Sequence, residues 1–393
     1  MECLECNDMK DRKVIYISNS TTSVKNRTLF QRPLYLCKNY HTYVFCRDFI
    51  GKEIRKKAKI AKTCPIRRFP FNLILFPIWA FFNTLIYGKR GDIVYTTHER
   101  WPVIISFFLK KMGFLWIVDF LDDPILSVKY FEGKTGIKKK LQYSVANLIY
   151  LIAKRCLQQG DLFISLYPPG YLKRNYTVDE EKVFRVTNGV DLSIVKPMIK
   201  NQKQEIFKIV YVGRLAKERG LGLIIQVAEV LKGLIPAYRF LLIGDIDKED
   251  KKLLIKVIKQ KRLDGYIEQL RELDHRQVLK IIANSSICIC PFLKTELLDY
   301  AFPVKIFEYM AMGKAVVATR LKGICQIIKD GENGLLVEPG NFQEMAEAIK
   351  KLYYDTNLKE KIEKNALKSV QKYDWKIINS CIGQKINQFI LNH

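Results

Sequence analysis

Short apolar runs alternate with longer stretches of helical periodicity along most of the chain, and this alternation constrains the fold more than any other feature. Apolar runs rich in β-branched residues are typical of strands buried on both faces, and helices between them indicate a parallel sheet. We predict strands at residues 14–18, 93–97, 115–120 and 162–166, and again at 208–212, 240–243, 286–290, 315–318 and 335–337. Two such sets predict an α/β fold with two doubly wound, Rossmann-like domains.

An Asn-Gly turn at Asn188 and Gly189 marks the expected domain boundary. A polar, lysine-bearing stretch follows, so residues 191–207 are the expected linker. The length of 393 residues also favours two domains, because single hydrophobic cores rarely grow beyond about 250–300 residues. We predict an N-terminal domain over 1–190, a C-terminal domain over 191–373, and a closing helix over 374–393 that packs back toward the N-terminal domain.

The chain is strongly basic, with a formal net charge of +26. Residues 1–187 hold 32 Lys and Arg against 16 Asp and Glu, so +16 of this charge lies in the first half. Excess positive charge attracts phosphate-bearing partners such as nucleotides, anionic lipids and nucleic acids without choosing between them. A lysine-rich composition spread over solvated faces is the alternative. No nucleic-acid-binding module is recognisable, so nucleic acid is not an expected partner.

The ten cysteines show no regular spacing, which predicts reduced thiols rather than a disulfide framework. Cys3 and Cys6 form a C-x-x-C pair, but no second pair stands at zinc-binding spacing, so we expect no metal site. The N-terminus lacks a basic segment followed by an apolar core, and a cytoplasmic location is therefore expected.

Residues 71–88 form an uncharged, strongly apolar stretch that Pro77 and Asn83 interrupt. Its length is marginal for a membrane span, and two interpretations remain: a helix buried in the core, or a segment that dips into a membrane surface. Basic residues on both sides suit attraction to anionic headgroups at the inner face of the membrane. These residues include Arg55, Lys56, Lys57, Lys59, Lys89 and Arg90.

A glycine and two arginines follow the predicted strand at 208–212. Gly213 allows a close turn, and Arg214 and Arg219 leave the same loop. Ligands of doubly wound folds bind at the carboxyl ends of strands, and guanidinium groups there suit a diphosphate. Two solvent-exposed arginines are the alternative.

A second candidate segment begins at Pro303 and is predicted to be a helix that ends before Gly313. Lys305 and Glu308 are three residues apart and therefore share a face near the start of this helix. The free amides and dipole there favour phosphate, to which Lys305 adds charge, whereas Glu308 suits ribose hydroxyls. The alternative is a simple Lys–Glu pair at the surface.

Taken in order, these segments resemble family 4 of the retaining glycosyltransferases over about residues 161–375. This family has the GT-B fold, in which two Rossmann-like domains face each other across a cleft. The motifs that carry the resemblance are DLFIS at 161–165, VTNGVD at 186–191, GR at 213–214 with RG at 219–220, LIGD at 242–245, FEYMA at 307–311 and NG at 333–334.

The resemblance implies transfer of a sugar from a nucleoside diphosphate sugar to a hydroxyl, with retention of the anomeric configuration. Arg214 and Arg219 would grip the diphosphate, although the family usually has Lys where Arg219 stands, and Glu308 would bind the ribose. Cationic side chains and helix amides can stabilise a diphosphate leaving group, so no metal or other cofactor is expected. A lipid-linked or polysaccharide acceptor fits the family.

Two positions depart from the family pattern. Tyr300 stands where the family has the first Glu of a paired motif, and Leu121 stands where many members have His. Asp122 or Asp123 is then the candidate acceptor-side residue, with turn formation as the alternative role. His98, after a predicted strand, is a second catalytic candidate, with a structural role as its alternative.

These departures leave two rival functions open. A sugar-nucleotide epimerase or hydrolase with the same fold would use the donor without passing sugar to an acceptor. A catalytically silent scaffold would bind the nucleotide sugar and do no chemistry.

Overall fold

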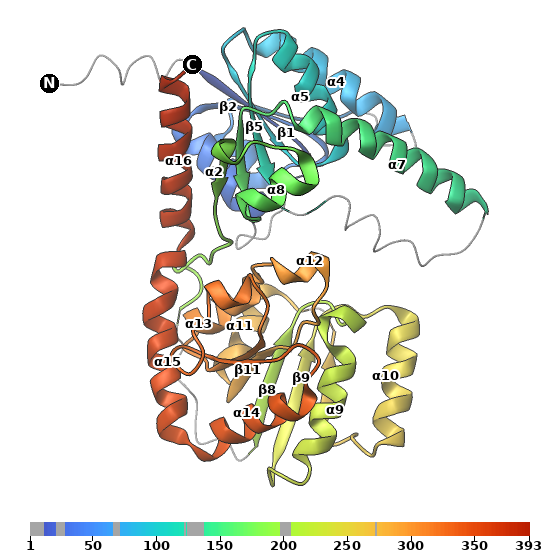
Figure 1. The fold of residues 1–393 in the computed structure, drawn as a ribbon, viewed down its shortest axis with the longest axis vertical. Coiled ribbons are helices and arrows are strands. Elements are labelled where there is room, and N and C mark those ends of the chain that lie inside the picture. Colours follow the sequence, from blue (N-terminus) through green and yellow to red (C-terminus); the bar gives the residue numbers. More distant parts are fainter. Residues whose placement is uncertain are drawn as a thin grey trace, which may run out of the picture. The chain divides into compact units, whose positions relative to one another are not determined.

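The computed structural model describes residues 12–20, 28–65, 71–121, 123, 137–196, 206–271 and 273–393. The chain divides into two compact units, which are described separately. Unit 1 comprises residues 1–188 and 375–393, and unit 2 comprises residues 189–374. Figure 1 shows a twisted sheet covered by helices in each unit.

Unit 1 contains a seven-stranded parallel sheet in the order β3-β2-β1-β4-β5-β6-β7. The strands are β1 (Lys13–Ser20), β2 (His41–Phe49), β3 (Ile60–Thr63), β4 (Ile93–Thr97), β5 (Leu115–Phe120), β6 (Leu162–Ser165) and β7 (Val183–Arg185). The helices are α2 (Thr28–Asn39), α3 (Lys52–Lys57), α4 (Phe71–Tyr87), α5 (Arg100–Lys111), α7 (Ile137–Leu157), α8 (Pro169–Tyr176) and α16 (Trp375–Leu391). The order of strands reverses between β1 and β4, which makes their shared edge the topological switch point.

The core of unit 1 lies between the sheet and helices α4 and α5. Alternate residues of β1, Ile15 and Ile17, pack there with Phe76 and Ala80 of α4 and Leu109 of α5. Helix α4 thus buries one face in the core and leaves another face exposed, which is compatible with both interpretations of the apolar stretch. No helix in the described part of the chain is long and apolar enough to cross a membrane.

The opposite face of this sheet holds a buried ion pair. Arg32 of α2 contacts Asp119 at the end of β5, and both side chains are almost fully buried. The Tyr95 hydroxyl donates to the second carboxylate oxygen of Asp119 at 3.1 Å. Burial lowers the pKa of the Arg32 guanidinium. Helix α16 packs beside α2, where the Tyr40 hydroxyl donates to Asn387 Oδ1 at 2.9 Å.

Unit 2 contains a six-stranded parallel sheet in the order β10-β9-β8-β11-β12-β13. The strands are β8 (Phe207–Val212), β9 (Tyr238–Ile243), β10 (Ile267–Leu270), β11 (Ile287–Cys290), β12 (Val316–Thr319) and β13 (Leu335–Val337). The helices are α9 (Leu221–Leu231), α10 (Lys248–Gln260), α11 (His275–Ala283), α12 (Glu296–Asp299), α13 (Val304–Ala311), α14 (Phe342–Tyr354) and α15 (Thr356–Val370). The switch point of this sheet lies between β8 and β11.

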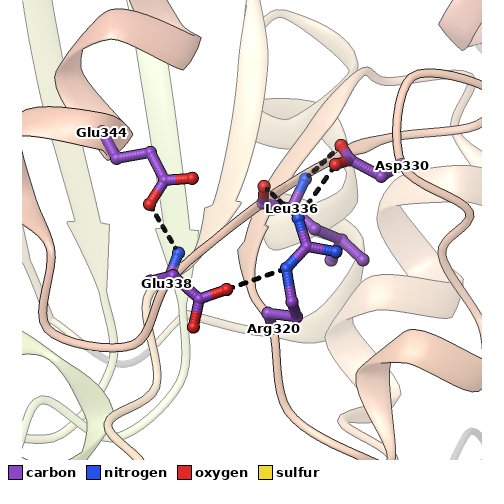
Figure 2. A network of polar contacts seen from close by, with 5 residues as sticks. All are labelled: Arg320, Asp330, Leu336, Glu338 and Glu344. Atoms are coloured by element: carbon purple, nitrogen blue, oxygen red, sulfur yellow. Dashed lines mark hydrogen bonds and ion pairs between the residues drawn. The ribbon is translucent and has the colours of Figure 1, made fainter.

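A polar network ties the short edge strand β13 to its surroundings (Figure 2). Arg320, which follows β12, bonds Asp330 at 2.9 Å and Glu338 at 3.0 Å. The Leu336 amide of β13 donates to Asp330, and the Glu338 amide donates to Glu344 of α14 at 2.8 Å. A strand of three residues has few ladder bonds of its own, so these side chains fix its position.

The predicted α/β class with two doubly wound sheets is confirmed. All nine predicted strands are present within two residues of their predicted ends. Four strands were not predicted: β2, β3, β7 and β10. Three of them lie at sheet edges and carry charged residues, namely Lys62, Arg185 and Glu268. The predicted helix from Pro303 is α13, and Gly313 after it has the left-handed φ of 67°.

Candidate functional site

The loops at the unit 2 switch point lie in direct contact. Gly213 and Arg214 follow β8, and Pro291 and Phe292 follow β11. A Cβ atom on Gly220, which has φ 84°, would lie 2.0 Å from the Pro291 carbonyl oxygen. Any side chain at this position would therefore push the two loops apart. The backbone is built to bring the ends of β8 and β11 together.

Lys305 reaches this junction from the first turn of α13. Its side chain is buried, and a Cβ atom on Gly213 would lie 2.8 Å from the Lys305 Nζ. Gly213 also has φ 128°, which other residues rarely adopt. The glycine thus keeps open the space into which the lysine points. The structure therefore places two sequence-predicted site residues, Gly213 and Lys305, side by side.

Two aromatic rings hold the cations of this junction, which we call the cationic junction: Arg219 and Lys305 with Tyr211 and Phe292. Lys305 Nζ lies 3.8 Å from the centroid of the Tyr211 ring and 4.8 Å from that of Phe292. The Arg219 guanidinium lies 5.4 Å from the same Phe292 ring. Rings attract cations without neutralising their charge, so the junction stays positive toward an incoming anion.

The two cations of the cationic junction also act on a neighbouring thiol. Burial raises the pKa of Cys290 to about 11, and Lys305 and Arg219 both act to lower it. Cys290 is the last residue of β11, so the two cations act on the carboxyl end of that strand. An anion that binds there gains the same interaction.

Arg214 has a different environment from Arg219. Its side chain is exposed, and its Nη2 contacts Asp247 at 2.8 Å. Asp247 is the residue before α10. That both arginines contact one diphosphate stays a prediction. To contact a diphosphate, the Arg214 guanidinium must either keep its contact with Asp247 and bind with its remaining N–H groups, or release Asp247.

Glu308 of α13 is also buried and contacts His275, the first residue of α11. Glu308 Oε1 and His275 Nε2 are 2.8 Å apart. The preceding residue, Asp274, caps α11 and forms a capping box with Gln277. Because Lys305 and Glu308 are both buried, the alternative of a simple surface pair does not describe them. His275 was missed in the sequence, where a histidine after a capping residue carries no special signal.

The position of the family's first glutamate has a structural role here. Tyr300 ends the short helix α12, and Lys322 Nζ donates to its hydroxyl at 3.1 Å. The adjacent Asp299 contacts Lys322 at 3.2 Å and accepts the Lys322 amide. Asp299 therefore holds the loop after β12 through Lys322.

The unit 1 switch point is lined by hydroxyl groups and one carboxylate. Ser18 ends the regular pairing of β1, Thr97 ends β4, and the Glu99 carboxylate accepts from both hydroxyls. The Asn19 amide donates to the same carboxylate. Burial raises the pKa of the Glu99 carboxyl to about 7. Glu99 stands before α5 but does not cap it, so its carboxylate joins the two strand ends instead.

Sequence reasoning singled out His98 rather than Glu99 at this edge. The Leu121 amide donates to His98 Nδ1 at 3.4 Å, and the His98 ring lies against Phe120. A neutral imidazole that accepts at Nδ1 carries its proton on Nε2, which makes Nε2 the donor toward a ligand. The contact brings His98 next to Leu121, the residue before Asp122.

Asp122 and Asp123, the two candidate acceptor-side residues, follow β5. Asp122 lies outside the described residues. Asp123 is buried and accepts from the hydroxyls of Tyr171 at 2.5 Å and Tyr176 at 2.7 Å. Asp123 is therefore a structural residue that anchors α8. No cluster of three potential metal ligands occurs in the described ranges, and Cys3 and Cys6 lie outside them.

The comparisons with known proteins show the fold of the chain and a family to which part of it is similar. Sucrose-phosphate synthase from Thermosynechococcus elongatus superposes with a TM-score of 0.72 at 18% identity, covering 97% of this chain and all of that one. Anabaena HepE, solved in complex with UDP, superposes with a TM-score of 0.73 at 16% identity, covering 96% of this chain and all of HepE. The fold is GT-B, as predicted.

Residues 196–369 match the family described as glycosyl transferases group 1. This segment of the chain is similar to that family, and the resemblance found in the sequence is confirmed. The matched segment contains the cationic junction, Glu308 and His275.

Curated relatives match over different lengths. The capsular polysaccharide biosynthesis glycosyltransferase CapM of Staphylococcus aureus is 23% identical over 97% of this chain and 98% of its own length. The phosphatidyl-myo-inositol mannosyltransferase of Mycolicibacterium smegmatis is 24% identical over 50% of this chain and 50% of its own length. The chain thus spans about half the length of some curated relatives that it matches and nearly all of another.

Proposed function

We propose that this protein transfers a glycosyl group from a nucleoside diphosphate sugar to a hydroxyl, with retention of the anomeric configuration. The observation that carries the proposal is the cationic junction, which lies at the switch point of a doubly wound sheet inside the group 1 glycosyltransferase segment. Ligands of such sheets bind at this point, and two cations suit a diphosphate. HepE, which shares the fold, was solved with UDP.

The reaction breaks the bond between the anomeric carbon and the diphosphate, so negative charge grows on the leaving oxygen. Lys305 and Arg219 are held by aromatic rings in positions that need little reorganisation. Preorganised cations stabilise developing charge more effectively than mobile ones. The free amides at the start of α13 add to this field. We therefore propose that the chain needs no divalent metal.

Glu308 supplies the contact to the nucleoside. A carboxylate repels phosphate but accepts hydrogen bonds from the two ribose hydroxyls. The contact between His275 and Oε1 fixes the orientation of the carboxylate. In this arrangement Lys305 and Glu308, one turn apart on α13, serve the diphosphate and the ribose respectively.

The acceptor binds, on this proposal, at the carboxyl edge of the unit 1 sheet. His98 Nε2 is a donor there, and the Glu99 carboxylate is an acceptor, so both partners of a sugar hydroxyl are present. CapM is named for capsular polysaccharide biosynthesis, and the Mycolicibacterium relative for phosphatidyl-myo-inositol. We propose a polysaccharide or lipid-linked acceptor and a cytoplasmic site of action.

A nucleotide screen tests the donor site directly. UDP, GDP and ADP, alone and with their common sugars, are added to the full chain, and the shift of the unfolding temperature is measured. One nucleotide should stabilise the wild type, and Glu308→Ala should weaken its binding by about 1.5–3 kcal/mol. Binding of no nucleotide would remove the donor site. Donor cleavage with no sugar reaching any hydroxyl acceptor would favour the epimerase or hydrolase, and binding without cleavage the scaffold.

The same preparation tests the role of metal. Activity should persist in excess EDTA, because protein cations stabilise the leaving group. Complete loss in EDTA with recovery on adding magnesium would show that a metal does this instead.

A further inference from the structure

Three neighbouring helices of unit 1 expose most of the large apolar side chains found at the described surface. Of the fourteen that are exposed, seven lie on α4, α5 and α7, and an eighth, Met112, caps α5. The eight are Ile78, Phe82, Ile86, Phe108, Met112, Leu148, Leu151 and Ile152. Helix α5 packs against both α4 and α7, as Figure 1 also shows. We call these eight side chains the apolar flank.

Helix α4 shows that the exposure is organised. Ile78, Phe82 and Ile86 are 51%, 57% and 71% exposed and recur every four residues, so they form one stripe. Phe76 and Ala80 face the core from the opposite side of the helix. Scattered surface hydrophobics are normal in soluble proteins, whereas eight exposed apolar side chains gathered on three adjacent helices indicate a patch.

The charges of the same helices are of one sign. Helices α4, α5 and α7 contain no Asp or Glu, whereas α5 has three Lys or Arg and α7 has five. Each of these helices runs antiparallel to the strands that it connects. Their C-terminal ends therefore all lie on the side where the strands begin. Exposed Lys89, Arg90, Lys111 and Arg155 stand at or just beyond those ends. The basic cluster at Arg55–Lys59, singled out in the sequence, is not needed for this arrangement.

We infer that the apolar flank docks on an anionic lipid bilayer. Lys110 of α5 is paired with Asp161, but the other cations at these helix ends form a basic rim beside the apolar flank, on helices that contain no Asp or Glu. This combination matches the interfacial region of a membrane, where apolar side chains enter the acyl boundary and lysines meet headgroups. A protein partner of mixed charge would be met by carboxylates as well as lysines. The docking deepens the proposed function, because it brings the enzyme to lipid-linked acceptors. Its evidence, however, is independent of the transfer reaction.

Unit 2 supplies a matched control. Leu253 and Ile255 of α10 are 59% and 47% exposed, comparable to the α4 stripe, but Glu249 and Asp250 lie on the same helix. Helix α10 exposes apolar side chains to a similar extent but carries charges of both signs, so it should show no preference for anionic lipid. The comparison separates a docking surface from simple stickiness.

The test is flotation of the full chain with vesicles of phosphatidylcholine, or of phosphatidylcholine and phosphatidylglycerol in equal parts, at low and high salt. The wild type should float with the anionic vesicles at low salt and only partly at high salt. Phe82→Gln with Ile86→Gln should lower the bound fraction at least tenfold, and Leu253→Gln with Ile255→Gln should leave it unchanged. Lys111→Gln with Arg155→Gln should lower binding at low salt only.

Several outcomes would overturn the inference. The first is a wild type that floats with no vesicle, and the second is an equal loss of vesicle binding in the flank and α10 variants. The third is a wild-type dimer that the flank substitutions dissociate in sedimentation, because a second copy of the chain would then cover the apolar flank. Nucleotide binding is measured on the same preparations. Vesicle binding without nucleotide binding would contradict the proposed function and support the docking surface. Nucleotide binding without vesicle binding would support the proposed function and contradict the docking surface.

Discussion

The two units share a topology but differ in what they place at the switch point. In unit 2 the strand ends present two cations held by aromatic rings. In unit 1 they present hydroxyls, an imidazole and one carboxylate of raised pKa. Similar backbones thus present positively charged side chains in one unit and hydrogen-bonding side chains in the other. The fold supplies the location, and the side chains at the strand ends decide the ligand.

Buried charge also serves different ends in the two units. Arg32 of unit 1 meets the carboxylate of Asp119 within the protein, and both are almost fully buried. Lys305 of unit 2 meets aromatic rings next to a glycine. The first arrangement satisfies a charge internally, whereas the second keeps a positive field.

Removing Arg32 should have the largest effect. Arg32→Leu leaves the Asp119 carboxylate buried without its cation, which should lower the free energy of unfolding by about 3–5 kcal/mol. Chemical denaturation measures this change. The double variant Arg32→Leu with Asp119→Leu should recover much of the loss, because no isolated charge remains. A single variant within about 1 kcal/mol of the wild type would show that the pair is not buried as described.

Replacing Lys305 should cost binding rather than stability. Lys305→Met should weaken nucleoside diphosphate affinity by about 1.5–3 kcal/mol, roughly 10- to 150-fold, because a charge-assisted contact is lost. Calorimetric titration measures it. The matched control is Lys314, a second buried lysine, which donates to the carbonyls of Ala283 and Ser285. Lys314→Met should lower stability and leave affinity unchanged. Equal effects of both variants on affinity would remove Lys305 from the diphosphate site.

The contrast between units also explains what the sequence could predict. Central strands such as β4, β5 and β11 are buried on both faces and are nearly continuous apolar runs, so they were predicted. Strands β3, β7 and β10 each have one neighbour, contain charged residues and lack that signal. Burial on both faces, rather than strand formation itself, is what a sequence pattern reveals.

The residues of the candidate site were also predictable only where a local sequence pattern contains them. Lys305 and Glu308 belong to one helical segment with local spacing, so a single stretch of sequence revealed both. His275 contacts Glu308 across 33 positions, and Glu99 contacts Ser18 across 81. Pairs this distant are created by the sheet topology, which local patterns do not encode. The first pair lies in the proposed donor site, and the second lies in the proposed acceptor site.

The Glu99 carboxyl should make unit 1 sensitive to pH. Its pKa rises from an ordinary 4.5 to about 7 on folding. Between these values the folded chain holds a proton that the unfolded chain has released, so stability should fall as pH rises from 4.5 to 7 and then level off. Glu99→Gln should remove this slope, measured as unfolding temperature against pH. Glu181→Gln, an exposed position of the same unit, should keep it. A slope unchanged in Glu99→Gln would assign the proton to another group.

The smallest predicted effect separates orientation from contact in the donor site. His275 does not touch the ligand on this proposal; it orients Glu308 through Oε1, and the ribose hydroxyls contact the carboxylate. His275→Ala should therefore weaken binding of the nucleoside diphosphate by about 0.5–1.5 kcal/mol, the net value of one hydrogen bond. The same substitution should weaken binding of the 2′-deoxynucleoside diphosphate less. His275→Gln, whose amide can still donate, should restore part of the difference.

The neighbour Asp274 provides the control for that experiment. It caps α11, so Asp274→Ala removes a cap worth about 0.5–2 kcal/mol of stability from the same helix end. If α11 acted only as a scaffold, both variants would reduce affinity for the ribo and 2′-deoxy nucleotides equally. Selective loss of ribose preference in His275→Ala alone would show that the histidine orients Glu308. Equal loss in both variants would reduce His275 to a structural residue and leave Lys305 as the distinctive feature of unit 2.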